Sequence, residues 1–340
     1  MPNLSAFVYE SAKYIERADP SAVRFLDPHQ DYLLTSRMRV KLIEDKYRSS
    51  AEVLDKANEL VEINSGWFLK SNNWILATLQ KPFLTDLGIY FMQNEFLTTT
   101  HIAFLNTGLT KEALSESSLT LDNLGPHIKA RMVDVGRYIG GLAKGLGTGD
   151  PLSARGPEIS LPPIQFRDLK SQPFYESIAH RVAPNCPSVS LLLTWMFSQI
   201  NTARIIVPII AEQNKVAAFK IRFVALFQIA SSLRKLLEDN QKDSFLKPDA
   251  ATKIGDLLND GSVLKVQEAK GLRNNLVHYT VPKREASELS SNLPLFGLVE
   301  AHSNGRSLEA MRHDVALGLA YVSQGIRSLL PQTLKPQGTI

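Results

Sequence analysis

The sequence is short of the residues that build disulfide frameworks and cysteine-rich metal sites. Cys186 is its single cysteine in 340 residues, so an internal disulfide cannot form and a zinc site made of several cysteines is excluded. Such low cysteine use is typical of a reducing compartment, and we expect a cytoplasmic protein. The seven histidines form no His-x-x-x-His pair and no Glu-x-x-His cluster. The sequence therefore predicts neither a metal site nor a cofactor.

Long uninterrupted apolar runs are also missing. A membrane-spanning helix needs about 20 consecutive apolar residues, and the most apolar stretch of this chain, 189–210, is broken by polar side chains. These are Ser190, Thr194, Ser198, Gln199, Asn201 and Arg204. We therefore expect a buried helix there and no membrane partner. Charged residues at 10, 13 and 16 interrupt the N-terminus, which does not have the pattern of a signal peptide.

Charge and length set weak limits on partners and architecture. The chain carries 38 lysines and arginines against 34 aspartates and glutamates, a net charge of +4, with a pI near 9.0. This balance is compatible with a polyanion such as RNA, although many basic proteins bind no nucleic acid. A hydrophobic content of 44% is that of a globular chain, and 340 residues are long for one domain.

A segment rich in glycine and proline divides the chain. Gly145-Leu146-Gly147-Thr148-Gly149 lacks the Gly-Lys-Ser/Thr of a phosphate-binding loop, so we interpret it as a helix end that runs into a linker. Prolines then recur through the next forty residues. We predict a helical domain over 1–150, a proline-rich connecting segment over 151–185 and a second helical domain over 186–332.

Apolar periodicity predicts an all-α fold. In the first half, 37–63 has the pattern of one long amphipathic helix or a broken pair. We interpret the aromatic-rich stretch from Trp67 to Phe96 as helical core, although the threonines at 98–100 favour a strand. The second half predicts a bundle of four or five helices. Its expected helices cover 188–207, 208–238, 249–258, 262–279 and a last one that starts at Ser307, with a possible hairpin at 304–305.

The predicted helix over 262–279 carries a polar group of particular interest. On a helical wheel Leu272 and Leu276 face the core, whereas Arg273, Asn274 and His278 spread over the opposite side. Val277 lies among them, although it is apolar and this face of the helix should be exposed to solvent. A partner subunit that covers this face would explain it, so we place Val277 at a homodimer interface.

An arginine and a histidine this close together suit the cleavage of RNA. The 2′-hydroxyl of RNA is a built-in nucleophile, and an imidazole, which titrates near pH 6.5, can remove its proton or protonate the leaving oxygen. A guanidinium is always charged and can hold the scissile phosphate through two hydrogen bonds. Arg273 and His278 are therefore the candidate catalytic residues.

The stretch Gly271-Leu272-Arg273-Asn274-Asn275-Leu276-Val277-His278 resembles the motif of the HEPN family, small helical bundles that include many metal-independent ribonucleases. That motif is an arginine, four to six residues and a histidine, with a polar residue after the arginine; here Asn274 takes that place. The resemblance covers roughly 185–332 and implies a homodimer whose two motifs share one cleft. It also implies a 2′,3′-cyclic phosphate product, with Asn274 positioning the phosphate or the histidine.

The resemblance further implies single-stranded RNA as substrate, a role in stress response, as a toxin or in anti-phage defence, and a regulatory or antitoxin protein as a possible partner. Two alternatives stay open. Arg273, Asn274 and His278 could form an ordinary solvated helix face. The bundle could also be a non-catalytic module for dimerisation or RNA binding, as in family members that have lost catalysis.

Overall fold

The structure is a computed structural model that describes residues 2–17, 19–21, 23–24, 30–43, 50–69, 85–107, 126, 128–130, 132–133, 136–137, 160–212, 214–278, 289–290, 292–331 and 334. The sequence also predicts a helix over 123–146, of which only a few helical residues between 126 and 137 fall within these ranges. The glycine-rich segment 145–149 lies outside them.

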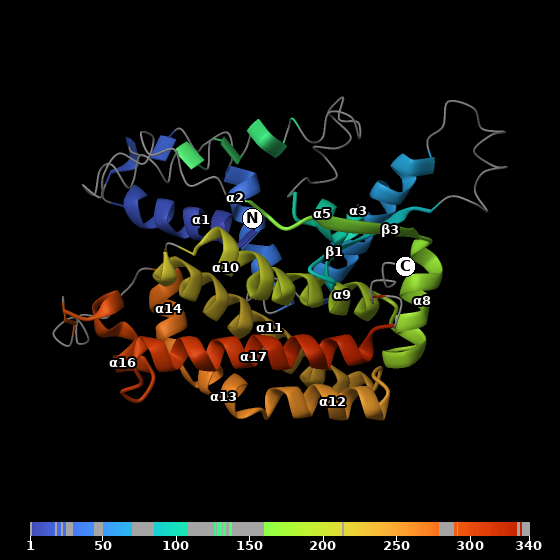
Figure 1. Cartoon of the computed structure of the whole chain (residues 1–340). Helices are drawn as coiled ribbons and strands as arrows, with labels where there is room; N and C mark the ends of the chain where they lie inside the picture. The colour runs from blue at the N-terminus through green and yellow to red at the C-terminus, as the bar shows by residue number, and fades with distance from the viewer. Residues whose placement is uncertain are drawn as a thin grey trace.

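The described chain is mostly helical, with a small sheet packed among the helices (Figure 1). Within the described residues, three helices precede the sheet: α1 (Pro2–Glu16), α2 (Gln30–Lys41) and α3 (Ser50–Leu69). The others are α5 (Thr100–Leu105), α8 (Ser171–Val182), α9 (Ser188–Asn201), α10 (Val207–Ile210), α11 (Lys215–Asp243), α12 (Pro248–Leu258), α13 (Gly261–Glu268), α14 (Lys270–His278), α16 (Leu298–His302) and α17 (Leu308–Leu329). A π-helical turn over Thr202–Ile206 joins α9 to α10, and a 3-10 turn, Pro294–Gly297, leads into α16.

The prediction of an all-α chain is wrong at one place, a three-stranded antiparallel sheet of order β2-β1-β3. Its strands are β1 (Leu87–Met92), β2 (Glu95–Thr99) and β3 (Ile164–Leu169). Gln93 and Asn94 both have positive φ, 53° and 62°, the geometry of a tight two-residue hairpin turn. Aromatic and β-branched residues on either side then pair across it, which overrides the helical interpretation of this stretch.

The strand β3 and the helix α8 both fall inside the segment that the sequence suggested as a connection. β3 pairs with β1 from Leu87–Leu169 to Met92–Ile164, so a strand from beyond residue 160 completes a sheet begun near residue 87. Along β3 the side chains of Ile164 and Phe166 are exposed, whereas Leu169 packs against the main core. The segment therefore contributes to the folded body as well as linking the two halves.

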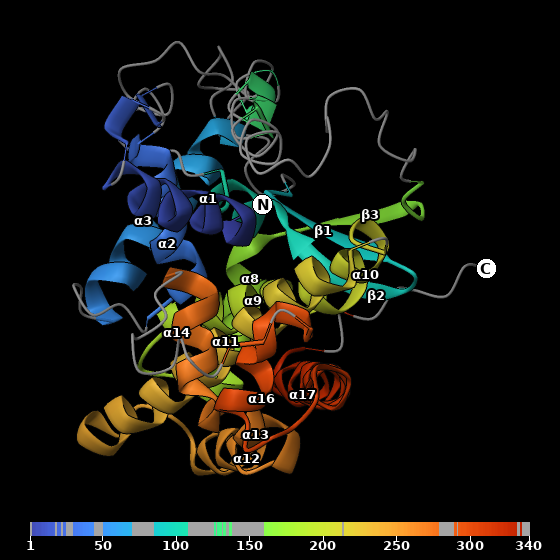
Figure 2. The ribbon, with the colours of Figure 1, turned by 90° about the vertical axis from the view of Figure 1, so that its left-hand side faces the viewer.

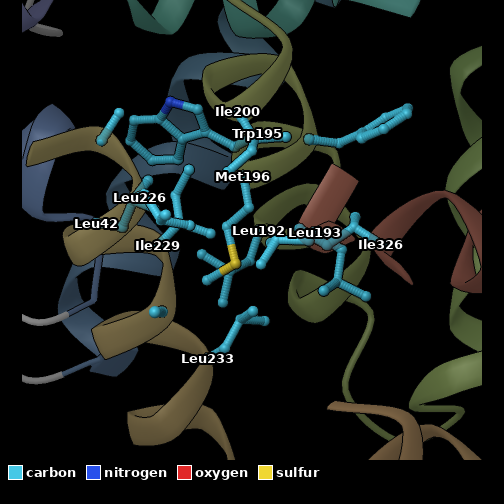
Figure 3. Close-up of a cluster of buried hydrophobic side chains, with 14 of the residues drawn as sticks. Leu42, Leu192, Leu193, Trp195, Met196, Ile200, Leu226, Ile229, Leu233 and Ile326 are labelled. Atoms are coloured by element: carbon cyan, nitrogen blue, oxygen red, sulfur yellow. The ribbon is translucent and has the colours of Figure 1, made fainter. Parts of the chain in front are cut away.

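One hydrophobic core runs through both halves of the chain. A single cluster of buried side chains extends from Ala6 to Leu334 and includes residues of α2, α3, the sheet and every long helix of the second half. Helix α9 lies at its centre, because every residue from Val189 to Asn201 is buried. Figure 3 shows Leu192 and Met196 of this helix surrounded by side chains of α11, such as Leu226 and Leu233.

Helix α11 owes its apolar character to this core. Among the described residues it is the one helix whose length and composition would also suit a membrane span, and 61% of its most apolar window is buried inside the structure. A central helix of a folded domain has the same profile. The feature therefore does not establish a membrane association.

Several helix boundaries agree with those predicted from the sequence, and others differ from them. The first predicted long helix is a broken pair, α2 and α3, and α3 continues to Leu69. Helix α12 (Pro248–Leu258) and the Ser307 cap of α17 are confirmed. The expected helix over 262–279 is two helices, since Ala269 leaves helical geometry at ψ 42° and Asp260 caps the first. Asn304 and Gly305 form a turn without strands.

Two buried hydrogen bonds of the Asn201 side chain connect three elements of the structure. The Asn201 side-chain amide donates to the backbone carbonyl of Phe96 at 2.8 Å, and its oxygen accepts from the Ser323 hydroxyl at 2.7 Å. These bonds connect the end of α9 to β2 and to α17. All three groups are shielded from water, so each needs its partner.

We expect Ser323→Ala to lower the free energy of unfolding by about 1–2 kcal/mol, because the amide oxygen of Asn201 loses its buried donor. Ser328→Ala is the matched control on the same helix. The Ser328 hydroxyl is exposed and bonds to the carbonyl of Gly325, so its removal should change stability by less than about 0.5 kcal/mol. Urea unfolding of both variants measures the difference. Equal stabilities would contradict the prediction.

Candidate functional site

The arginine and histidine of the sequence motif lie on α14, which packs against three neighbours. These are α11 and α16 of the second half and, on the remaining side, α1 from the start of the chain. Figures 1 and 2 both place α1 beside α14, although about 260 residues separate them in the sequence. The motif therefore sits where the second half of the chain packs against the N-terminal helix.

Arg273 is buried, which the helical wheel did not predict. Its side chain is 8% exposed, and the guanidinium carbon lies 5.6 Å from the centre of the Phe227 ring on α11. Nη1 donates to the side-chain oxygen of Asn274 at 3.0 Å. An arginine stem buries apolar surface readily while its planar head stacks on an aromatic face. The wheel missed this contact because it assumed that α14 buries a single stripe.

The two asparagines after Arg273 have different environments. Asn274 is exposed, as the sequence suggested, whereas Asn275 is buried and its Nδ2 lies 2.6 Å from Nε2 of His302. Gly271 permits this close approach of α16, because a Cβ atom there would lie 2.4 Å from Nδ1 of His302. Asn275 and His302 therefore fix the angle of α14, and Asn274 remains at the surface beside Arg273.

His278 is held by a carboxylate that the sequence gave no reason to connect with it. Nδ1 of His278 lies 2.9 Å from Oε2 of Glu10 on α1. The His278 side chain is 33% exposed and the Glu10 side chain 12%, so the pair stands at the rim of the α1–α14 contact. The partners are 268 positions apart in the sequence, so no local pattern could have shown that they meet.

Val277 is buried, and the side chains that bury it belong to the same chain. Its side chain is 9% exposed and lines a small cavity with Ala6, Phe7 and Glu10 of α1. The sequence assigned this cover to a partner subunit. A dimer contact through Val277 now requires α1 to move away, because α1 occupies the face of α14 that the contact would use.

Arg273 also lines a larger cavity, of about 1110 Å³. The cavity runs beside α11 and is bordered by α3 and by the start of α9. Lys41, at the end of α2, lines both this cavity and the small one at Val277. At the far end of the cavity, Lys235 and Asp239 form an ion pair at 2.8 Å. Although desolvation acts to raise it, the hydrogen bonds from Lys235 and Ser50 lower the pKa of Asp239.

A second group of titratable side chains lies apart from α14, around the buried imidazole of His101. His101 stacks on Tyr175 with 5.8 Å between ring centres, and its Nδ1 lies 3.3 Å from the tyrosine oxygen. Burial lowers the pKa of His101 to about 4 despite the opposing effect of Asp86, and burial raises the pKa of Tyr175. Asp86 accepts the backbone N–H of Ser171 at the start of α8 at 2.7 Å. Because the ring of His101 is fully buried, it cannot reach a substrate, and the group serves to join α5 to α8.

Within the described part of the chain, no three histidine, cysteine, aspartate or glutamate side chains gather as metal ligands would. No protein-family model, curated protein or solved structure matches the chain. Possible functions therefore have to be judged from the residues of the site and their geometry.

Proposed function

We propose that this protein is a metal-independent endoribonuclease in which Arg273 holds the scissile phosphate and His278 transfers the proton. The observation that carries the proposal is the imidazole of His278, held by the Glu10 carboxylate at 2.9 Å, on the same helix as a cavity-lining arginine. A histidine oriented by a carboxylate is the usual arrangement of a general base. The resemblance of the Arg273–His278 stretch to the HEPN motif supports the same chemistry.

The reaction needs two proton transfers and one cation. A base takes the proton of the 2′-hydroxyl, the 2′-oxygen attacks phosphorus, and the 5′-oxygen leaves with a proton from an acid. The products are a 2′,3′-cyclic phosphate end and a 5′-hydroxyl end. The guanidinium of Arg273 stabilises the negative charge that builds on the phosphate oxygens. Asn274 accepts a hydrogen bond from that guanidinium and would keep it oriented.

A single imidazole cannot easily act as base and acid at once. The proposal therefore includes a homodimer in which His278 of a second copy supplies the other proton transfer, with single-stranded RNA between the two copies. Asn274 is exposed and the His278 side chain partly so, and these residues would line the shared cleft beside α1. The HEPN resemblance adds a role in stress response or anti-phage defence, with a regulatory or antitoxin protein as a possible partner.

We expect the purified protein to cleave single-stranded RNA equally well with and without EDTA, because the proposed chemistry uses only side chains. The products should carry 2′,3′-cyclic phosphates, detectable by mass spectrometry. The matched control is the same RNA with 2′-O-methyl groups, which lacks the nucleophile and should stay intact. Cleavage that EDTA abolishes, or cleavage of the methylated RNA, would contradict the proposal.

A non-catalytic interaction module is the competing function, and the burial of Arg273 favours it. A guanidinium stacked on Phe227 at 5.6 Å can serve simply to join α11 to α14. In that case the protein binds RNA or a second copy without cleaving RNA, and His278→Ala leaves the binding unchanged. The EDTA experiment separates the two functions, since the module gives no products under either condition.

A further inference from the structure

We infer that Glu10 is a positioning residue of the Arg273–His278 site, so that the N-terminal helix is part of the catalytic apparatus. The inference rests on the proposed endoribonuclease function and adds a residue to it. Neither the spacing of the motif nor its place on a late helix involves α1. The contact that carries the inference is the 2.9 Å approach of the Glu10 carboxylate to Nδ1 of His278.

The contact determines which ring nitrogen carries the proton. An ionised carboxylate has no hydrogen to give, so the hydrogen bond requires Nδ1 of His278 to be the donor. In the neutral ring the lone pair then belongs to Nε2, the nitrogen that would accept the proton of the 2′-hydroxyl. Glu10 thus selects the tautomer that can act as a base and fixes the plane of the ring.

Packing holds Glu10 in place relative to α14. Phe7, one turn earlier on α1, is buried against the main core, and the ammonium of Lys220 on α11 lies 4.3 Å from the centre of its ring. Burial lowers the pKa of Lys220 to about 8, and the side chain is only partly exposed at this contact between α1 and α11. Because α1 is anchored at Phe7, the Glu10 carboxylate reaches His278 from a fixed backbone.

The role of Glu10 in the reaction is electrostatic. When Nε2 of His278 accepts the 2′-hydroxyl proton, the ring becomes an imidazolium, and the carboxylate 2.9 Å from Nδ1 stabilises the new charge. Glu10 itself stays ionised and takes no proton, and the leaving 5′-oxygen receives its proton from the second imidazole. Loss of Glu10 should therefore slow the chemical step and leave RNA binding unchanged.

Two substitutions separate the orientation of the ring from the charge. We expect Glu10→Ala to lower kcat by about 100-fold with KM unchanged, because both the tautomer and the charge are lost. Glu10→Gln keeps an acceptor for Nδ1–H and should retain the tautomer with a smaller loss of kcat. The matched control is Glu16→Ala, since Glu16 lies on the same helix in an exposed pair with Lys13 at 3.1 Å and should leave kcat unchanged.

Nitrogen-15 NMR of the His278 ring gives a readout that does not depend on activity. At a pH high enough for the nitrogen-15 shifts to show a neutral ring, wild type and Glu10→Gln should show the Nδ1–H form, and Glu10→Ala should shift toward Nε2–H. Far-UV circular dichroism checks that each variant folds. If Glu10→Ala and Glu10→Gln both unfold, Glu10 is a structural residue and the inference is wrong.

The experiment distinguishes failure of the inference from failure of the proposed function. Cleavage by wild type that His278→Ala abolishes and Glu10→Ala leaves intact would overturn the positioning role alone. The absence of cleavage by wild type would overturn the endoribonuclease function, and the role of Glu10 in it would fall at the same time. A kcat loss in Glu10→Ala with an unaltered His278 tautomer would also reject the inference.

Discussion

Replacing His278 by asparagine is expected to lower the rate of RNA cleavage by at least about 1000-fold, because the site loses the group that transfers the proton. Asparagine keeps a polar side chain of similar size at the end of α14, so the fold should survive. Initial rates on a fluorescently labelled RNA measure the effect. His313→Asn on α17, where the histidine is exposed, is the control and should cleave at the wild-type rate.

The substitution Arg273→Lys tests the role of the guanidinium in the same site. Lysine keeps the charge but loses the planar fork that binds two phosphate oxygens and stacks on Phe227, so we expect a loss of about 100-fold in cleavage. If His278→Asn retained more than a tenth of the wild-type rate, His278 would not be catalytic. If Arg273→Lys cleaved as well as wild type, Arg273 would not hold the phosphate in the way proposed.

The second large effect concerns stability and pH. We expect the free energy of unfolding to fall by about 2 kcal/mol between pH 7 and pH 5 on account of His101 alone. Burial lowers the pKa of His101 from 6.5 to about 4 in the folded protein, so between these values the unfolded chain binds a proton that the folded chain does not. The stabilisation is complete above pH 6.5, decreases as the pH falls toward 4, and does not change further below.

Urea unfolding at the two pH values, in wild type and in His101→Gln, measures this contribution. Glutamine does not titrate, so the variant should lose about 2 kcal/mol less than wild type over the same interval. His180→Gln replaces an exposed histidine of α8 and should behave as wild type. Although burial acts to raise it, the hydrogen bonds from Ser171 hold the pKa of Asp86 below its ordinary value of 3.8. Asp86 therefore does not contribute to the change in stability between pH 7 and pH 5. Equal pH slopes in wild type and His101→Gln would contradict the prediction.

The sequence was sufficient where a structure depends on local pattern. The three- and four-residue steps of apolar side chains predicted α17, and the helix expected over 249–258 is α12. Helix α13 begins at Gly261, one residue before the predicted start at 262, because Asp260 caps it by accepting the N–H groups of Ser262 and Val263.

What the sequence could not predict depends on contacts between distant segments. The sheet forms because β3, more than 60 residues away, pairs with β1, and the hairpin turn at Gln93 and Asn94 has no glycine to mark it. At the candidate site, the helix and its Arg273–His278 spacing were predictable. The burial of Arg273 on Phe227 and the approach of Glu10 were not, because a helical wheel contains no information on which neighbours cover each face.

The continuity of the hydrophobic core affects how the protein can be divided. Side chains of α3 and the sheet pack on α9, and α2 packs on α11, so that both helices bury part of their surface against the first half of the chain. In a fragment that starts at residue 186, this apolar surface would be exposed to water, and the fragment would tend to self-associate. Any attempt to prepare the motif-bearing half by itself would therefore need a substitute for the missing half, such as the first 107 residues supplied as a separate polypeptide.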